Sequence, residues 1–163
     1  MSGDALWHEA RKLLALEGLA LDRKDWDLWL SLYMPEASYW VPAWSDEGEP
    51  TSDPRRELSL IYYRDRGGLE DRVFRLRTGK SPAATLSFRT CHFSQLMSVD
   101  QDGDRLLVRA NWQTQSLVDG EPVSYYGWAD YVLRSVDDHW RIASKTTTLV
   151  NDRSNTLIDF YLL

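Results

Sequence analysis

The sequence predicts an α+β fold in which helices pack against a curved, mostly antiparallel sheet. Three observations support this prediction. Apolar residues recur at helical intervals near the amino terminus, the second half of the chain contains four long stretches typical of strands, and short turn sequences separate these stretches. Because the helices precede most of the strands, the most economical packing lays them on one face of the sheet, as an α+β cone or cystatin-like shape.

The first helix is expected over residues 4–21. Its apolar residues recur at mostly helical intervals, and they are Leu6, Ala10, Leu13, Leu14, Leu16 and Leu21. A second helix is expected to start at Asp22 or Arg23. Its aromatic and apolar residues follow at i, i+3, i+4 and i+7, and they are Trp26, Trp29, Leu30 and Tyr33. Pro35 disfavours further helix, so the second helix is expected to end near Tyr33.

Two different segments follow the second helix. Residues 37–44 are rich in aromatic side chains and predict a short strand, in which Pro42 indicates an edge position or a bulge because proline cannot donate to a ladder. Residues 45–54 concentrate Ser, Asp, Glu, Gly and Pro, which is typical of an exposed loop. The loop is expected to join elements of one domain.

The middle of the chain is expected to add one strand and one helix. Residues 58–63 are apolar and aromatic and predict a strand or a buried run. Residues 69–78 place Leu69, Val73 and Leu76 on one helical face, with arginines elsewhere, and predict a third helix.

Four long antiparallel strands are expected in the second half, over residues 88–99, 105–118, 122–136 and 139–150. In the second of them one alternating set of residues is mainly apolar, as a half-buried sheet requires, and this set is Leu106, Val108, Ala110 and Trp112. The final residues, 157–163, are too apolar to remain in solvent and are expected to pack on this domain or on a neighbouring chain. We expect residues 1–163 to form a single domain, since this length suits one packed core.

Composition excludes several classes of protein. The chain has 19 basic and 25 acidic residues, a net charge of −6 and no cluster of Lys and Arg, so nucleic acid is not an expected partner. The first residues do not resemble a signal peptide, and no stretch approaches the length of a membrane span, so we expect a cytoplasmic protein without a membrane partner. The single cysteine precludes an internal disulfide.

That cysteine, Cys91, directly precedes His92, which raises the question of a nucleophile and its base or of a metal site. Adjacent side chains in a strand project to opposite faces, so the two are expected to diverge, and Cys91 is expected to be structural. A Rieske cluster requires two Cys and two His, which one cysteine excludes. The other histidines, His8 and His139, lie in a predicted helix and a predicted turn, so no metal site is expected in this chain.

The remaining catalytic interpretation is proton transfer in a cone-shaped pocket, with His92, Asp130 and Tyr39 as acid or base groups. A structural interpretation is simpler for each of them: His92 hydrogen-bonded within the sheet, Asp130 on a solvated face and Tyr39 in the aromatic core. The sequence lacks the glycine-rich nucleotide motifs and the GxSxG motif of hydrolases. Five arginines are expected on a solvated helix face or in interface ion pairs, and these are Arg64, Arg66, Arg72, Arg75 and Arg77.

Several stretches together resemble one known family. They are LYMPEASYWVPAW (32–44), LSLIYYRDRGGLEDRVFRLRTG (58–79), FRTCHF (88–93) and KTTTLVNDRSNTLIDFYLL (145–163). In combination and order they resemble the small (β) subunit of aromatic-ring-hydroxylating dioxygenases of the benzoate and anthranilate type. The likeness covers almost the whole chain. Family members often have Ser before the Arg-Thr pair and Asn soon after the His, whereas this chain has Phe88 and Ser94.

The resemblance implies an NTF2-like cone and a non-catalytic subunit in an α3β3 assembly, with the small subunits self-associating as a trimer. The large (α) subunit would carry the Rieske [2Fe–2S] cluster and the mononuclear Fe(II), and would perform cis-dihydroxylation with electrons from NADH that pass through a reductase. Arg89 and His92 match the family pattern and are expected to be structural or interface residues. The apolar end of the chain adds Leu157, Phe160 and Tyr161 as interface candidates.

Two hypotheses therefore come from the sequence. The first is a structural subunit of such a dioxygenase, acting with a large subunit on anthranilate or benzoate, which the sequence does not distinguish. The second is a free-standing NTF2-like isomerase or dehydratase that uses His92, Asp130 and Tyr39.

Overall fold

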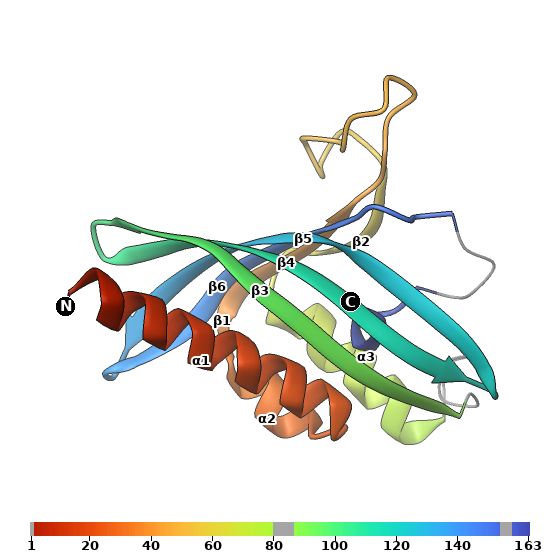
Figure 1. Cartoon of the computed structure of the whole chain (residues 1–163). Helices are drawn as coiled ribbons and strands as arrows, with labels where there is room; N and C mark the ends of the chain where they lie inside the picture. Colours follow the sequence, from red (N-terminus) through yellow and green to blue (C-terminus); the bar gives the residue numbers. More distant parts are fainter. Residues whose placement is uncertain (1, 80–86, 154–157) are drawn as a thin grey trace.

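A curved six-stranded sheet forms one layer of the molecule, and three helices cover its concave face (Figure 1). The computed structural model describes residues 2–79, 87–153 and 158–163. The helices are α1 (Gly3–Asp22), α2 (Trp26–Ser31), α3 (Arg66–Thr78) and the short 3₁₀ helix η2 (Phe160–Leu162). The strands are β1 (Tyr33–Pro42), β2 (Ser59–Tyr63), β3 (Phe88–Asp102), β4 (Arg105–Val118), β5 (Glu121–Val136) and β6 (His139–Leu149).

The strand order is β2-β1-β6-β5-β4-β3, and all neighbours are antiparallel except β1 and β6. Alternation along the strands separates a concave face from a convex face. In β4 the concave residues Leu106 and Val108 are buried, whereas Leu107 and Arg109, which alternate with them, are exposed on the convex face. The predicted α+β architecture, with four long sequential strands and helices on one face, is confirmed.

Helix ends are fixed by side chains that the sequence supplies. Ser2 caps α1 by accepting a hydrogen bond from the Ala5 amide, and Asp25 caps α2 by accepting one from the Leu28 amide. At the end of α3, Gly79 has a φ of 69°, a left-handed conformation that glycine adopts without steric cost.

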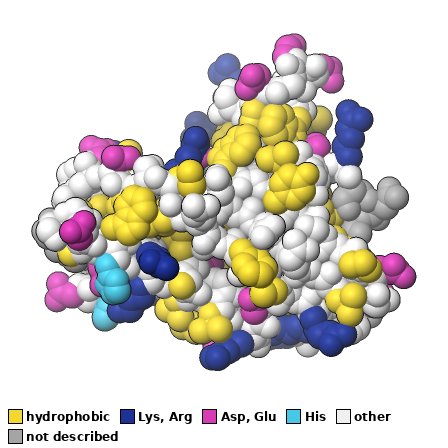
Figure 2. Space-filling model, in the orientation of Figure 1, with side chains coloured by type: hydrophobic (Ala, Val, Ile, Leu, Met, Phe, Trp, Pro, Cys, Tyr) yellow, Lys and Arg dark blue, Asp and Glu magenta, His cyan; other side chains and the backbone are white. Residues whose placement is uncertain are grey.

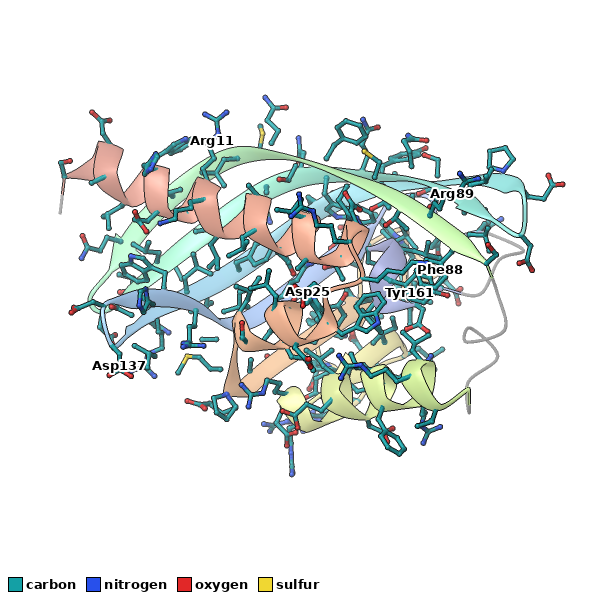
Figure 3. All side chains as sticks on the ribbon, turned by 90° about the horizontal axis from the view of Figure 1, so that it is seen from below. Arg11, Asp25, Phe88, Arg89, Asp137 and Tyr161 are labelled. Carbon is teal, nitrogen blue, oxygen red and sulfur yellow. The ribbon has the colours of Figure 1, made fainter. Side chains whose placement is uncertain are left out.

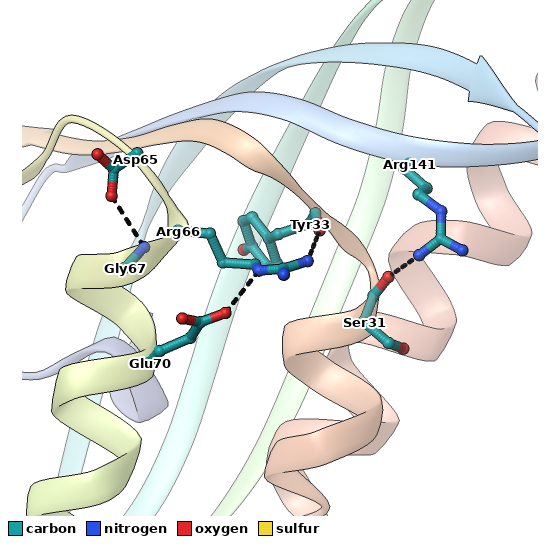
Figure 4. A network of polar contacts seen from close by, with 7 residues as sticks. All are labelled: Ser31, Tyr33, Asp65, Arg66, Gly67, Glu70 and Arg141. Carbon is teal, nitrogen blue, oxygen red and sulfur yellow. Dashed lines mark hydrogen bonds and ion pairs between the residues drawn. The ribbon is translucent and has the colours of Figure 1, made fainter.

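The boundary between α2 and β1 differs from the prediction. Tyr33 does not end the helix but begins β1, because its backbone pairs with Ile142 of β6 and the Leu32 carbonyl accepts from the Ile142 amide at 2.8 Å. Two arginines satisfy neighbouring carbonyls: Arg66 donates to the Tyr33 carbonyl at 2.9 Å, and Arg141 donates to that of Ser31 (Figure 4). Pairing between distant segments therefore overrides the helical spacing.

Two smaller predictions have different outcomes: one of the two alternatives for Pro42 is confirmed, and the start of the third helix is corrected. Pro42 is not in an edge strand, since β1 lies between β2 and β6, but the register shifts at Val41/Pro42, which is the predicted bulge. Helix α3 begins at Arg66 and not at Leu69, because the Asp65 side chain caps it by accepting from the Gly67 amide at 2.9 Å.

Aromatic side chains dominate the core between the helices and the sheet. The largest fully buried side chains include Trp29, Tyr33, Tyr39, Tyr125, Phe160 and Tyr161. The end of the chain contributes directly: Phe160 stacks on Trp29 with ring centroids 4.5 Å apart, and Tyr161 stacks on Phe88 at 4.0 Å (Figure 3). The apolar tail was expected to pack either on this domain or on a neighbouring chain. The described residues 158–163 pack on their own domain.

Candidate functional site: the two faces of the sheet

The end of α1 is joined to β3 by a carboxylate clamp. Asp22 accepts hydrogen bonds from the Thr90 hydroxyl at 2.9 Å and from the His92 amide at 3.1 Å, and its Oδ1 lies 2.5 Å from Nδ1 of His92. Burial alone would raise the pKa of Asp22, but the hydrogen bonds from His92 and Thr90 outweigh burial and lower it. This clamp orients the His92 ring and fixes α1 over the sheet.

A second carboxylate lies deeper in the cone, where Glu17 of α1 is 3% exposed. It accepts from the hydroxyls of Tyr33 at 2.5 Å and Tyr131 at 2.8 Å and pairs with the Lys145 ammonium at 2.9 Å. Burial opposes its charge, but Lys145 and the two hydroxyls prevail and lower the pKa of Glu17. Burial and the Glu17 charge raise the pKa of Tyr33 and of Tyr131 well above the usual value.

The space beside these groups is small. A cavity of about 80 Å³ is lined by Glu17, His92, Tyr131 and Lys145, among others. A cavity of about 150 Å³ binds benzene, and this space has about half that volume, which leaves little room for an aromatic ring. Because the Glu17 carboxylate is already occupied by three donors, the geometry suits a structural role better than proton transfer.

The structure does not assemble the three predicted acid–base residues into one site. His92 faces the concave side, and Tyr39 is 1% exposed within the core. Asp130 lies on the convex face, because its neighbour Tyr131 points inward, and it forms a bidentate ion pair with Arg109 at 2.7 and 2.8 Å. Tyr39 in the core and Asp130 on a solvated face agree with the structural interpretation, whereas His92 bonds a helix carboxylate and not the sheet.

The predicted interface residues occupy different environments. Arg89 (Figure 3) and Cys91 are exposed on the convex side of β3. Because His92 faces the concave side, Cys91 and His92 diverge as predicted. Phe160 and Tyr161 are each 1% exposed and pack in the core of their own chain. Leu157 lies outside the described residues.

The five arginines between residues 64 and 77 do not all lie on a solvated face. Arg64 is largely exposed, and Arg75 and Arg77 are about half exposed in surface ion pairs. Arg72, in contrast, pairs with Asp159, whose side chain is 4% exposed. This pair holds the end of the chain against α3.

The sequence reasoning missed Glu17 and Lys145. Glu17 lies four residues after Leu13 and four before Leu21, so it falls on the apolar stripe of α1. A charged residue on that stripe was the feature of the sequence that could have indicated a buried carboxylate. Nothing in the sequence around Lys145 indicated that its strand would place it opposite that stripe.

The convex face is open and carries aromatic side chains. A shallow hollow of about 600 Å³ is lined by uncharged residues, which are Phe93, Ser94, Gln95, Asn111, Trp112, Gln113, Tyr126, Gly127, Trp128 and Val150. Phe93 and Tyr126 are 49% and 48% exposed. Trp44, from the loop after β1, packs edge-on against Trp128. Figure 2 shows hydrophobic side chains gathered at the base of this loop. We call Trp44, Phe93, Tyr126, Trp128 and Val150 the convex patch.

Within residues 2–79, 87–153 and 158–163, no group of three or more His, Cys, Asp or Glu side chains is placed to hold a metal ion. None of the described helices has the length and hydropathy that a membrane crossing requires.

Comparison with known proteins gives consistent matches. The family model for the ring hydroxylating beta subunit matches residues 17–155. The chain is 43% identical to the benzoate 1,2-dioxygenase subunit beta of Acinetobacter baylyi over 92% of this chain and 89% of that protein. It is 41% identical to the anthranilate 1,2-dioxygenase small subunit of the same organism, over 86% of each chain. The crystal structure of the beta subunit of the benzoate 1,2-dioxygenase from Burkholderia mallei superposes with a TM-score of 0.75 at 38% identity, covering 94% of this chain and 95% of that one.

Proposed function

This chain belongs to the family of ring hydroxylating beta subunits, and from that premise we propose that it is the scaffold of a terminal oxygenase. It is the small subunit of an aromatic-ring-hydroxylating dioxygenase and so part of an oxidoreductase. The proposed assembly is α3β3, with three small subunits around a threefold axis and a large subunit held by helices or loops. Its proposed location is the cytoplasm.

The chemistry is assigned to the large subunit, and no catalytic residue is assigned to this chain. The proposed reaction is cis-dihydroxylation of an aromatic carboxylate such as benzoate or anthranilate. These are the compounds that appear in the names of the two relatives. The residues of this chain do not fit a Rieske cluster, since Cys91 is its only cysteine. The large subunit would therefore hold the [2Fe–2S] cluster and the mononuclear Fe(II), and NADH would supply electrons through a reductase.

The observation that supports a scaffold best is the convex patch. Protein interfaces are depleted of charge at their centre and enriched in Tyr, Trp and Phe. Four residues of this patch line the hollow, and all of the lining residues are uncharged. Self-association through the convex face would cover Phe93 and Tyr126, which are otherwise about half exposed. Arg89, on the same side of β3, is a proposed interface residue.

The other interface candidates act indirectly in this proposal. His92, through Asp22, holds β3 against α1, and Phe160 and Tyr161 fix the end of the chain in the core. Leu157 is kept as a proposed contact residue. The sheet and helices share one hydrophobic core, which supports treating residues 1–163 as one domain.

Light scattering coupled to size exclusion tests the proposal. The wild-type chain is expected to elute as a trimer, and the Phe93→Asp variant is expected to elute as a monomer. The aspartate would be buried at the centre of the interface without an ionic partner, which is unfavourable. Trp7→Asp is the matched control, since Trp7 is also an exposed aromatic residue, 39% exposed, but lies on α1. A wild-type chain that stays monomeric and does not bind the large subunit contradicts the scaffold.

A further inference from the structure

A groove on the helix side of the molecule contains none of the residues to which the proposed scaffold assigns a role. It lies between α1, α2 and the first residues of β6, with a volume of about 260 Å³. It exists because pairing of β1 with β6 begins only at Tyr33 and Ile142, so no strand covers residues 139–141 on that side. We call it the α1–β6 groove, and its lining residues are Glu9, Lys12, Leu13, Leu16, Leu28, Ser31, Leu32, His139, Trp140 and Arg141.

The floor and walls of this groove are apolar. Leu13 and Leu32 are buried at its base, and Leu16, Leu28 and Trp140 are partly buried and pack against the core. A cavity of about 150 Å³ holds benzene, so a groove of about 260 Å³ has room for a ring-sized body and a polar substituent. The Trp140 ring offers a flat surface for such a body.

The rim carries more positive than negative charge. Lys12 and Arg141 line the groove, Glu9 is the one acidic residue that does so, and the acidic turn Asp137-Asp138 is not part of the lining. The ion pairs found among the described residues include neither Lys12 nor Arg141.

The position of Arg141 is fixed by α2. One of its guanidinium nitrogens, Nη1, donates to the Ser31 carbonyl at the end of that helix, which holds the side chain over the groove (Figure 4). The guanidinium has further N–H donors in the same plane, and this planar fork matches a carboxylate. His139 adds an imidazole at the same end of the groove.

We propose that the α1–β6 groove binds a small carboxylate with an apolar, ring-sized body. The carboxylate would lie between Lys12 and Arg141, and the body against Leu16, Leu28 and Trp140. A charged head combined with an apolar body fits this distribution of walls and cations, whereas a neutral compound leaves both cations unpaired. The proposal rests on this groove alone and does not depend on the assembly of the subunit.

Fluorine NMR of the full chain labelled with 5-fluorotryptophan tests the proposal. The chain has eight tryptophans, and Trp140→Phe identifies the resonance of Trp140. Benzoate is the probe, and benzyl alcohol is its neutral counterpart. Benzoate is expected to shift the Trp140 resonance in a saturable way and to leave those of Trp44 and Trp128 in place, because these two lie on the convex face. Benzyl alcohol is expected to bind at least about tenfold more weakly.

Variants separate a specific site from a general effect of charge. Arg141→Gln is expected to weaken benzoate binding about tenfold and Lys12→Gln about threefold. Arg11→Gln is the matched control, because Arg11 adjoins Lys12 on α1 (Figure 3) but lines a different hollow, together with Trp7 and Leu96, as the lining of that hollow shows. Leu28→Trp fills the groove and is expected to abolish the shift, with circular dichroism to verify folding.

Three results would overturn the proposal. One is equal affinity for benzoate and benzyl alcohol, and another is an Arg11→Gln effect as large as that of Lys12→Gln. The third is a Trp140 shift that occurs only when the large subunit is added, since the groove would then be a contact with that subunit.

Discussion

The two faces of the sheet use charge in opposite ways, although they are built from the same strands. On the concave face Lys145 pairs with Glu17, and their side chains are 5% and 4% exposed. On the convex face Arg109 pairs with Asp130, and their side chains are 53% and 46% exposed. Asp130 and Tyr131 are neighbours in β5, so one step along the strand separates these environments.

The difference indicates which face maintains the fold and which is available to partners. Both side-chain oxygens of Glu17 accept from groups of its own chain, so this buried carboxylate is committed to the fold. The convex face keeps half-exposed aromatic side chains over an uncharged hollow. A small subunit whose task is assembly needs this division: a closed interior and an open sheet face.

The largest effect on stability is expected when one charge is removed from the interior. Glu17→Gln keeps the shape of the side chain but leaves the buried Lys145 ammonium without its carboxylate. Because an unpaired buried charge is strongly unfavourable, the free energy of unfolding is expected to fall by about 3–5 kcal/mol. Urea denaturation followed by circular dichroism measures it.

The control for that variant removes the second charge as well. The double variant Glu17→Gln/Lys145→Met should be more stable than Glu17→Gln alone, since no unpaired charge remains, and the amide can accept from one tyrosine hydroxyl and donate its NH2 to the other. A loss of less than about 1 kcal/mol for Glu17→Gln would mean that the pair is no more important than a surface pair.

The clamp between α1 and β3 should show an intermediate effect that depends on pH. The pKa of Asp22 is lowered in the folded chain, so its charge stabilises the fold above pH about 4, and this stabilisation is lost as the pH falls through the folded pKa. Asp22→Asn is expected to lower the free energy of unfolding at pH 7 by about 1.5 kcal/mol. The difference between wild type and variant should shrink in acid. Denaturation at several pH values measures it, and a difference independent of pH would contradict the role of the charge.

The alternation of side chains between the two faces of the strands could be predicted from the sequence. The period of two in β4 predicted an apolar face and a polar face, and the same rule predicted that Cys91 and His92 diverge. It also accounts for Asp130, which was predicted on a solvated face. These predictions succeed because side-chain direction in a strand is set locally.

Pairings between distant segments are what the sequence did not reveal. Asp22 meets Thr90 and His92, which follow it by 68 and 70 residues, and Glu17 meets Lys145 after 128 residues. The helical spacing of Tyr33 from Trp26, Trp29 and Leu30 predicted that it belongs to a helix. In the structure its backbone pairs with Ile142 of β6, so it belongs to a strand. Each of these outcomes depends on how the helices lie across the sheet, which no local pattern specifies.

The smallest effect is expected on the convex face, at the pair that mirrors the interior one. Arg109→Ala removes the partner of Asp130, but both side chains are about half exposed and water can solvate the remaining carboxylate. The expected loss in the free energy of unfolding is about 0.2–1 kcal/mol, and it should decrease at high salt because the pair is screened. Urea denaturation at low and at 1 M salt checks both points. A loss as large as that of Glu17→Gln, and insensitive to salt, would show that the convex face is also committed to the fold, and the contrast between the faces would then fail.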